Sequence, residues 1–81
     1  MIKVLFFASL RDRLNCDFVE IDFQKGLTLF QIKEILKRKN KLWRFAMSEN
    51  LLSSVEQEMV VGDYELSDGM EVAFFPPVTG G

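Results

Sequence analysis

The pattern of apolar and polar positions predicts two strands at the start of the chain. Residues 1–8 are rich in β-branched and aromatic side chains, and their even positions form a continuous apolar row. Leu5 and Phe7 add apolar side chains on the odd positions. The end of this strand is therefore apolar on both faces, which is typical of a central strand. Residues 18–23 alternate cleanly, with two acidic side chains outward, and predict a half-buried second strand.

Two helices are predicted in the middle of the chain. The first has a clear start, because Thr28 can act as N-cap and Gln31, three residues on, as its capping-box partner. Its apolar stripe consists of Leu29, Ile32, Ile35 and Leu36. A short second helix is expected over residues 42–47, with Leu42, Phe45 and Ala46 at helical spacing. Residues 9–14 can form one further helical turn, which Asn15 would leave in a left-handed conformation.

Three more strands complete the predicted sheet. Residues 51–55 and 58–61 predict a short hairpin that turns at Glu56 and Gln57, and residues 70–75 predict the last strand. The order of elements indicates an α+β fold of the β-grasp (ubiquitin-like) type. In that roll the first and last strands are central in a mixed sheet, one main helix covers one face, and a short second helix is added.

This arrangement leaves an apolar cluster on the uncovered face of the sheet. Leu5, Phe7 and Phe75 fall together there, near the end of the last strand. Burying one such side chain contributes roughly 1.5–3 kcal/mol, so a group of them in water indicates a face that binds a partner. The alternative is that Met47, Met59 or the loops fold over these side chains.

The end of the chain has its own pattern, Phe74-Phe75-Pro76-Pro77-Val78-Thr79-Gly80-Gly81. Proline cannot donate to a sheet ladder, so Pro76 and Pro77 end the strand and begin a stiff, extended segment. We therefore divide the chain into a β-grasp domain, residues 1–75, and an extended C-terminal tail, residues 76–81. The tail can reach about 20 Å, and its two glycines can pass through a slot that side chains would block. The alternative is an ordinary frayed terminus.

Composition excludes several kinds of chemistry. The 81 residues include no histidine and one cysteine, Cys16, so a four-cysteine zinc site, an internal disulfide and the usual general base are absent. The net charge of −2 offers no electrostatic footprint for nucleic acid. The apolar runs are too short to span a membrane, and Lys3 interrupts the first before a signal peptide could form. We expect a soluble, cytoplasmic domain that binds no metal.

Several segments together resemble one family, the small, sulfur-carrying subunits of molybdopterin synthase. They are residues 1–8, Leu10-Arg11-Asp12 and above all the long ending from Leu66 to Gly81, which contains DGMEVAFFPPVTGG. The resemblance covers the whole chain. Two turn positions depart from the family: Glu56 stands where Asn is frequent, and Asn15 where Gly is frequent. Neither departure concerns the tail.

The resemblance implies a function for the tail. An adenylating enzyme would use ATP and magnesium to convert the Gly81 carboxylate to an acyl-adenylate, and a sulfur donor would then replace AMP to leave a thiocarboxylate. The charged tail would enter the active site of the large synthase subunit and give its sulfur to the cyclic pyranopterin precursor, building the dithiolene of molybdopterin. A thiocarboxylate is an ionised, soft nucleophile that needs no histidine beside it. The chain would bind no cofactor and would not be catalytic alone.

The resemblance also assigns roles to residues. Gly81 would carry the sulfur, and Gly80 would give clearance. The large subunit would be held by the side chains of the uncovered face and by the tail: Phe7, Met59, Phe75, Pro76, Pro77, Val78 and Thr79. A heterotetramer of two large and two small subunits is the implied assembly. A sulfur-relay role for Cys16 is the weaker alternative to a structural one.

Three other functions fit the same pattern. A sulfur carrier of thiamine (thiazole) biosynthesis shares the roll, the Gly-Gly end and the adenylation step. A ubiquitin-like modifier would use the Gly-Gly end to form isopeptide bonds with lysines. A plain β-grasp binding module would have an inert tail. The lead-in from Phe74 to Thr79 favours the molybdopterin function.

Overall fold

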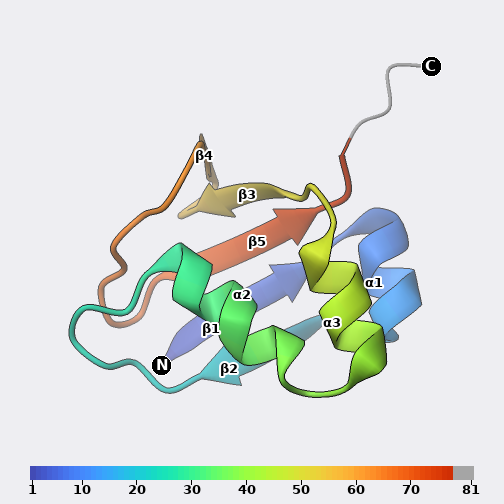
Figure 1. Cartoon of the computed structure of the whole chain (residues 1–81). Coiled ribbons are helices and arrows are strands. Elements are labelled where there is room, and N and C mark those ends of the chain that lie inside the picture. The colour runs from blue at the N-terminus through green and yellow to red at the C-terminus, as the bar shows by residue number, and fades with distance from the viewer. Residues whose placement is uncertain (78–81) are drawn as a thin grey trace.

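A five-stranded sheet and three helices make up the structure, a computed structural model that describes residues 1–77 (Figure 1). Val78, Thr79, Gly80 and Gly81 lie outside the described residues. The elements in chain order are β1 (Ile2–Phe6), α1 (Ala8–Leu14), β2 (Phe18–Ile21), α2 (Leu29–Lys37), α3 (Lys41–Ser48), β3 (Leu52–Val55), β4 (Glu58–Val60) and β5 (Glu71–Phe75).

The strand order confirms the predicted mixed sheet. The order is β2-β1-β5-β3-β4, in which β1 and β5 pair in parallel and all other neighbours pair antiparallel. The first and last strands are therefore both internal, as the apolar character of their two faces predicts. The parallel register sets Phe6 opposite Phe74, so the two strands end together.

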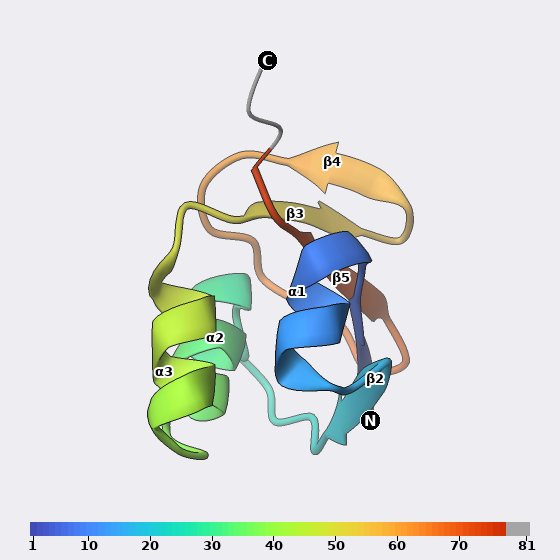
Figure 2. The ribbon, with the colours of Figure 1, turned by 90° about the vertical axis from the view of Figure 1, so that its right-hand side faces the viewer.

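One face of the sheet forms the core with the three helices, which gather on one side of the strands (Figure 2). The inward residues of β1 and β5 are buried: Ile2, Val4, Phe6, Val72 and Phe74. The ring of Phe6 meets Trp43 of α3 edge-on at 5.3 Å and stacks on Phe74 at 6.4 Å. α1, α2 and α3 all contribute buried residues to this core. The face is therefore covered by three helices and not by one main helix, as was predicted.

The start of α2 follows the predicted capping box. The Thr28 hydroxyl accepts from the Gln31 amide, and the Gln31 side chain accepts from the Thr28 amide. Asp63 adds a second cap to α2, because its carboxylate accepts a hydrogen bond from the Phe30 amide at 2.9 Å. Nothing in the sequence pattern predicts this contact. The loop before β5 is thereby fastened to the start of α2.

The inward face of α3 differs from the prediction. Trp43, Ala46 and Met47 are buried, whereas Leu42 is half exposed and Phe45 is 73% exposed. The helical spacing of Leu42, Phe45 and Ala46 therefore predicts the helix correctly, but of the three only Ala46 faces the core. A short helix that is apolar on most sides does not reveal its inner face by spacing. Ile35 of α2 was also placed on the apolar stripe, but it lies at the margin of that stripe, 38% exposed.

The predicted turns are confirmed by backbone conformation. Asn15 ends α1 with φ of 51°, in the left-handed region. Glu56 and Gln57, the two residues between β3 and β4, have φ of 51° and 67°. Two consecutive left-handed residues are the mark of a type I′ hairpin turn. The helical segment before Asn15 is longer than the single turn expected, since α1 has seven residues.

Candidate functional site

The face of the sheet opposite the helices carries a pair of stacked aromatic rings. Phe7 follows β1 directly and Phe75 closes β5, and their ring centroids lie 5.0 Å apart with planes 9° from parallel. The Phe7 amide donates to the Phe74 carbonyl at 3.2 Å, which fastens the two strand ends together. Phe7 stays 39% exposed, so the pair presents an aromatic surface to solvent. The predicted meeting of Phe7 and Phe75 is therefore confirmed.

A hollow of about 310 Å³ lies beside this pair. Its floor consists of two small residues, Ala73 of β5 and Ser54 of β3, which are direct neighbours across the sheet. Its rim includes the Phe7–Phe75 pair and Met59, which is 59% exposed. Small residues between large ones make the face concave, and a concave apolar surface suits the insertion of a partner's side chain.

The apolar surface extends beyond the hollow on both sides. Leu52 is the neighbour of Phe75 across β3 and β5, and it is 40% exposed. On the other side Leu5 lies between Ala73 and Phe18, and the Lys3 ammonium sits 4.8 Å above the Phe18 ring. We call this whole surface the docking face: Leu5, Phe7, Phe18, Leu52, Ser54, Met59, Ala73 and Phe75.

Sequence reasoning missed several members of the docking face. Phe18 lies two residues before Glu20 on the same strand, so its side chain is on the same outward face. The alternation of this strand could therefore have identified Phe18 as an outward residue. Leu52 and Ser54 depend on the register between β3 and β5, which the sequence does not reveal. Ala73 was predicted on the same face of the last strand as Phe75, but its position opposite Ser54 depends on that register too.

Met47 does not cover the docking face. It is 1% exposed and belongs to the core on the helix side of the sheet. The alternative in which Met47 folds over the apolar cluster is therefore wrong. Met59 does reach the cluster, but it joins the rim and remains largely exposed, so the surface stays open.

The tail leaves the body at the edge of the docking face. β5 ends at Phe75, and Pro76 and Pro77 follow as half-buried residues without regular structure (Figure 1). The remaining predicted tail residues, Val78, Thr79, Gly80 and Gly81, lie outside the described residues. This departure point sits directly beside the stacked Phe7–Phe75 pair. The partner-binding roles of Pro76 and Pro77 stay predictions.

The described residues contribute little reactive chemistry to this surface. Within residues 1–77 no group of three His, Cys, Asp or Glu side chains is placed to hold a metal ion. Cys16 is half-buried in the turn after α1, and its thiol donates to the Phe18 carbonyl at 3.3 Å. The groups with a displaced pKa in the described part of the chain, Lys33, Asp63 and Asp68, lie outside the hollow.

The described helices are short. The longest, α2, has nine residues, and none from residue 1 to 77 has the length and apolar character that a membrane crossing requires.

Comparison with known proteins places the chain in a family. The model of the ThiS family matches residues 4–81. The molybdopterin synthase sulfur carrier subunit of Escherichia coli (strain K12) is 43% identical over 84 aligned positions that cover all of both chains. The protein of the same name from Haemophilus influenzae is 34% identical, again over the whole of both chains. The resemblance inferred from the motifs is confirmed.

Solved structures confirm the fold. The crystal structure of SAMP1 from Haloferax volcanii matches with a TM-score of 0.81 at 20% identity, over 99% of this chain and 98% of that one. A complex of subunits 1 and 2 of the molybdopterin-converting factor from Helicobacter pylori includes a chain that matches with a TM-score of 0.69 at 21% identity, over 99% and 97% of the two chains.

Proposed function

The chain belongs to the ThiS family, and from this membership we propose that it is the sulfur-carrier subunit of a molybdopterin synthase. The observation that carries the proposal beyond family membership is the placement of the tail. Pro76 leaves the sheet directly beside the stacked Phe7–Phe75 pair, at the margin of an open, concave apolar face. A partner bound to that face would receive the tail in a fixed direction.

The tail would act as a carried substrate group. A carboxylate is a poor electrophile because its charge is delocalised, so the Gly81 carboxylate is first joined to AMP by an adenylating enzyme that uses ATP and magnesium. A donor of sulfide-level sulfur then attacks the acyl carbon, the bond from that carbon to AMP breaks, and AMP leaves, which gives a C-terminal thiocarboxylate without a change of oxidation state. Gly80 and Gly81 lack side chains and so allow the terminal group to enter a narrow active site. This cycle requires no cofactor on the chain itself.

The large synthase subunit is the partner that the docking face would bind. The Helicobacter pylori complex of two molybdopterin-converting factor subunits supports such an assembly. Phe7 and Phe75 would be the central contacts, since exposed aromatic side chains in a concave apolar surface are typical binding hot spots. Met59 would contribute from the rim, while Pro76, Pro77, Val78 and Thr79 would line the path of the tail. A heterotetramer of two large and two small subunits is part of this proposal.

Intact-mass measurement tests the sulfur-carrier function directly. The purified chain is mixed with ATP, magnesium, the adenylating enzyme and a sulfur source, with ATP left out as the control. We expect a mass gain equal to the replacement of one oxygen by sulfur, localised to Gly81 by fragmentation. An unchanged mass would contradict the proposal.

The same experiment separates the alternatives once acceptor proteins are added to it. Covalent conjugates to lysine side chains, without a thiocarboxylate, would identify a ubiquitin-like modifier. A thiocarboxylate that transfers only to a thiazole synthase would identify the thiamine pathway. Both curated relatives carry the molybdopterin name, which favours transfer to the large subunit of molybdopterin synthase.

A further inference from the structure

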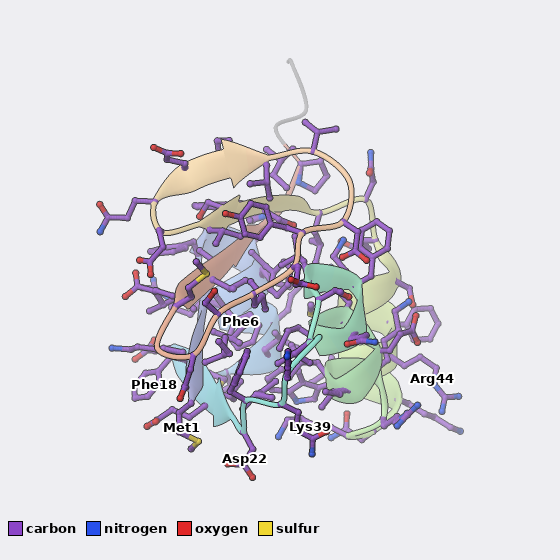
Figure 3. The ribbon with its side chains drawn as sticks, turned by 90° about the vertical axis from the view of Figure 1, so that its left-hand side faces the viewer. Met1, Phe6, Phe18, Asp22, Lys39 and Arg44 are labelled. Atoms are coloured by element: carbon purple, nitrogen blue, oxygen red, sulfur yellow. The ribbon has the colours of Figure 1, made fainter. Side chains whose placement is uncertain are left out.

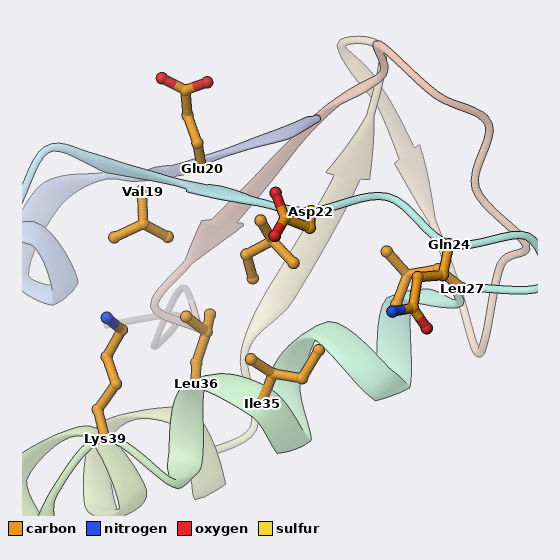
Figure 4. Close-up of a pocket in the computed structure, with 9 residues that line it drawn as sticks. Val19, Glu20, Asp22, Gln24, Leu27, Ile35, Leu36 and Lys39 are labelled. Carbon is orange, nitrogen blue, oxygen red and sulfur yellow. The ribbon is translucent and has the colours of Figure 1, made fainter.

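The edge of the sheet at β2 borders a second concave surface, on the helix side and away from the docking face. A groove of about 410 Å³ lies between β2 and the second half of α2 (Figure 4). Its walls are aliphatic, with Val19 and Ile21 on the strand and Ile35 and Leu36 on the helix. Lys39 closes the end near Val19, and Gln24 and Leu27 close the other end.

The outer edge of β2 has free hydrogen-bonding groups. β2 is the terminal strand of the sheet, and within residues 1–77 no strand pairs with its outer side. The Phe6 amide donates to the Asp17 carbonyl, and antiparallel pairing alternates, so residues 19 and 21 bond inward to β1. The amides and carbonyls of Phe18, Glu20 and Asp22 then point outward, and of these the Phe18 carbonyl already accepts a hydrogen bond from the Cys16 thiol at 3.3 Å. An edge of this kind can accept an added strand.

The charges around the groove specify the strand that would fit. The side chain of Glu20 points away from the helix, and both it and Asp22 stand along the open edge (Figure 4). Among the ion pairs of the described residues, none involves Glu20, Asp22 or Lys39. Asp22 and Lys39 both reach the surface on this side of the molecule (Figure 3). Directly opposite residues of neighbouring strands favour opposite charge. Glu20 already lies opposite Lys3 of β1 on one side, and basic side chains of the added strand would lie opposite Glu20 and Asp22 on the other.

We propose that the β2 edge and the groove beneath it bind an extended segment of a partner protein as a sixth strand. Its outward residues are basic and face Glu20 and Asp22. Its inward residues are aliphatic and enter the groove beside Ile21 and Ile35, and the inward residue at the Val19 end is acidic and meets Lys39. A second copy of this chain does not fit, since antiparallel pairing of two β2 strands would set their acidic residues against each other. This site goes beyond the sulfur-carrier function and does not involve the tail.

A short peptide serves as the probe. The antiparallel sequence Leu-Arg-Val-Lys-Asp, with both ends blocked, places Arg opposite Asp22, Lys opposite Glu20 and Asp beside Val19 and Lys39. It is titrated into the isotope-labelled full chain while backbone amide signals are recorded. We expect saturable shifts in residues 18–22 and 35–39. Shifts at Phe7, Met59 and Phe75 instead, or no saturable shift at millimolar peptide, would overturn the proposal.

Two matched controls separate strand addition from loose charge attraction. In the added strand the Arg amide faces β2 and the Val amide faces solvent. N-methylation of Arg should therefore weaken binding about tenfold, the loss of one hydrogen bond, while N-methylation of Val should leave it within about twofold. Equal effects of the two methyl groups would overturn strand addition.

Charge reversal tests the orientation of the segment. Lys39→Glu should weaken binding of this peptide about tenfold, and a peptide with Lys in place of Asp should recover it. No recovery would overturn the assigned orientation. Amide signals that change on dilution of the free protein, with a matching change in sedimentation, would instead show that a second copy occupies the edge and would overturn the partner assigned here.

Discussion

At the residue scale, Phe75 is the side chain on which the docking face most depends. It stacks on Phe7, neighbours Leu52, and stands where the tail departs. Phe75→Asp places a charge in the centre of this apolar surface, so we expect binding to the large subunit to weaken by about 2–4 kcal/mol, the range of hot-spot changes. Isothermal titration calorimetry measures this change.

The matched control for Phe75 is an aromatic residue that is more exposed and lies elsewhere. Phe45 of α3 is 73% exposed and is not part of the docking face. Phe45→Asp should leave the affinity unchanged. If Phe45→Asp weakened binding and Phe75→Asp did not, the large subunit would bind the helix side of the molecule.

Asp63 is the residue whose role the sequence concealed most fully. Slight burial raises the pKa of its carboxyl, but hydrogen bonds from the Phe30 and Tyr64 amides and from Thr28 outweigh this and hold the pKa below its usual value. Asp63→Ala removes a cap from α2 and should lower the free energy of unfolding by about 1 kcal/mol at pH 7. Urea unfolding followed by circular dichroism measures this loss.

The pH dependence of Asp63 follows from the direction of its pKa shift. A carboxyl whose pKa is lowered by folding adds stability above its unfolded pKa, near 3.8, and this stability is lost as the pH falls through the folded pKa. The difference between the wild type and Asp63→Asn, which keeps a capping oxygen without the charge, should therefore shrink as the pH falls below about 4. A difference that stays constant down to pH 2 would show that the charge has no role.

At the element scale, the turn between β3 and β4 is formed by residues that do not favour it. Glu56 and Gln57 both have positive φ, where glycine and asparagine are preferred. Gln57→Gly should raise the free energy of unfolding by about 0.5–1 kcal/mol, because glycine adopts this conformation without strain. The neighbouring change Glu58→Gly, inside β4, should lower stability instead. Equal effects in chemical unfolding experiments would contradict this account of the turn.

The elements were largely predictable because each has a local signal. β-branched and aromatic content defined β1, and alternation defined β2. The Thr28–Gln31 box defined the start of α2, and Asn15 marked the end of α1. The inner face of α3 was not predictable, since five of its eight residues are apolar. Only packing against α1, α2 and the sheet, where Phe6 meets Trp43, selects Trp43 and Met47 (Figure 2). Spacing within one element cannot report which neighbour that element meets.

The candidate site was predictable only where the position of a residue follows from its own strand. Phe7 and Phe75 were identified by parity within their own strands. The floor of the hollow, Ser54 and Ala73, results from the register of β3 on β5, which joins segments distant in the chain. The groove beside β2 likewise requires the placement of α2 against the edge strand. Features that lie between elements therefore emerged only with the structure.

At the scale of the whole molecule, the proposed function assigns folding and docking to the body, residues 1–75, and sulfur transfer to the tail, residues 76–81. The described core extends no further along the chain than Phe74, while the proposed sulfur-carrying group is the carboxylate of Gly81, seven residues later. The docking face and the β2 groove lie on opposite sides of the sheet, and the described core ends before the tail begins. Folding, docking and sulfur transfer should therefore respond separately to mutation.

Deletion of Gly81 tests this division most directly. No described core side chain is lost, so the midpoint of thermal unfolding should match that of the full chain, and binding to the large subunit should persist because the docking face is intact. Sulfur transfer should be abolished, since the carboxylate then lies one residue, about 3.5 Å, short of its position. Single-turnover assays with the large subunit measure transfer, and calorimetry measures binding on the same preparation. Transfer that continued without Gly81 would show that the terminal carboxylate is not the carrier, whereas loss of binding as well would show that the last glycine itself takes part in docking.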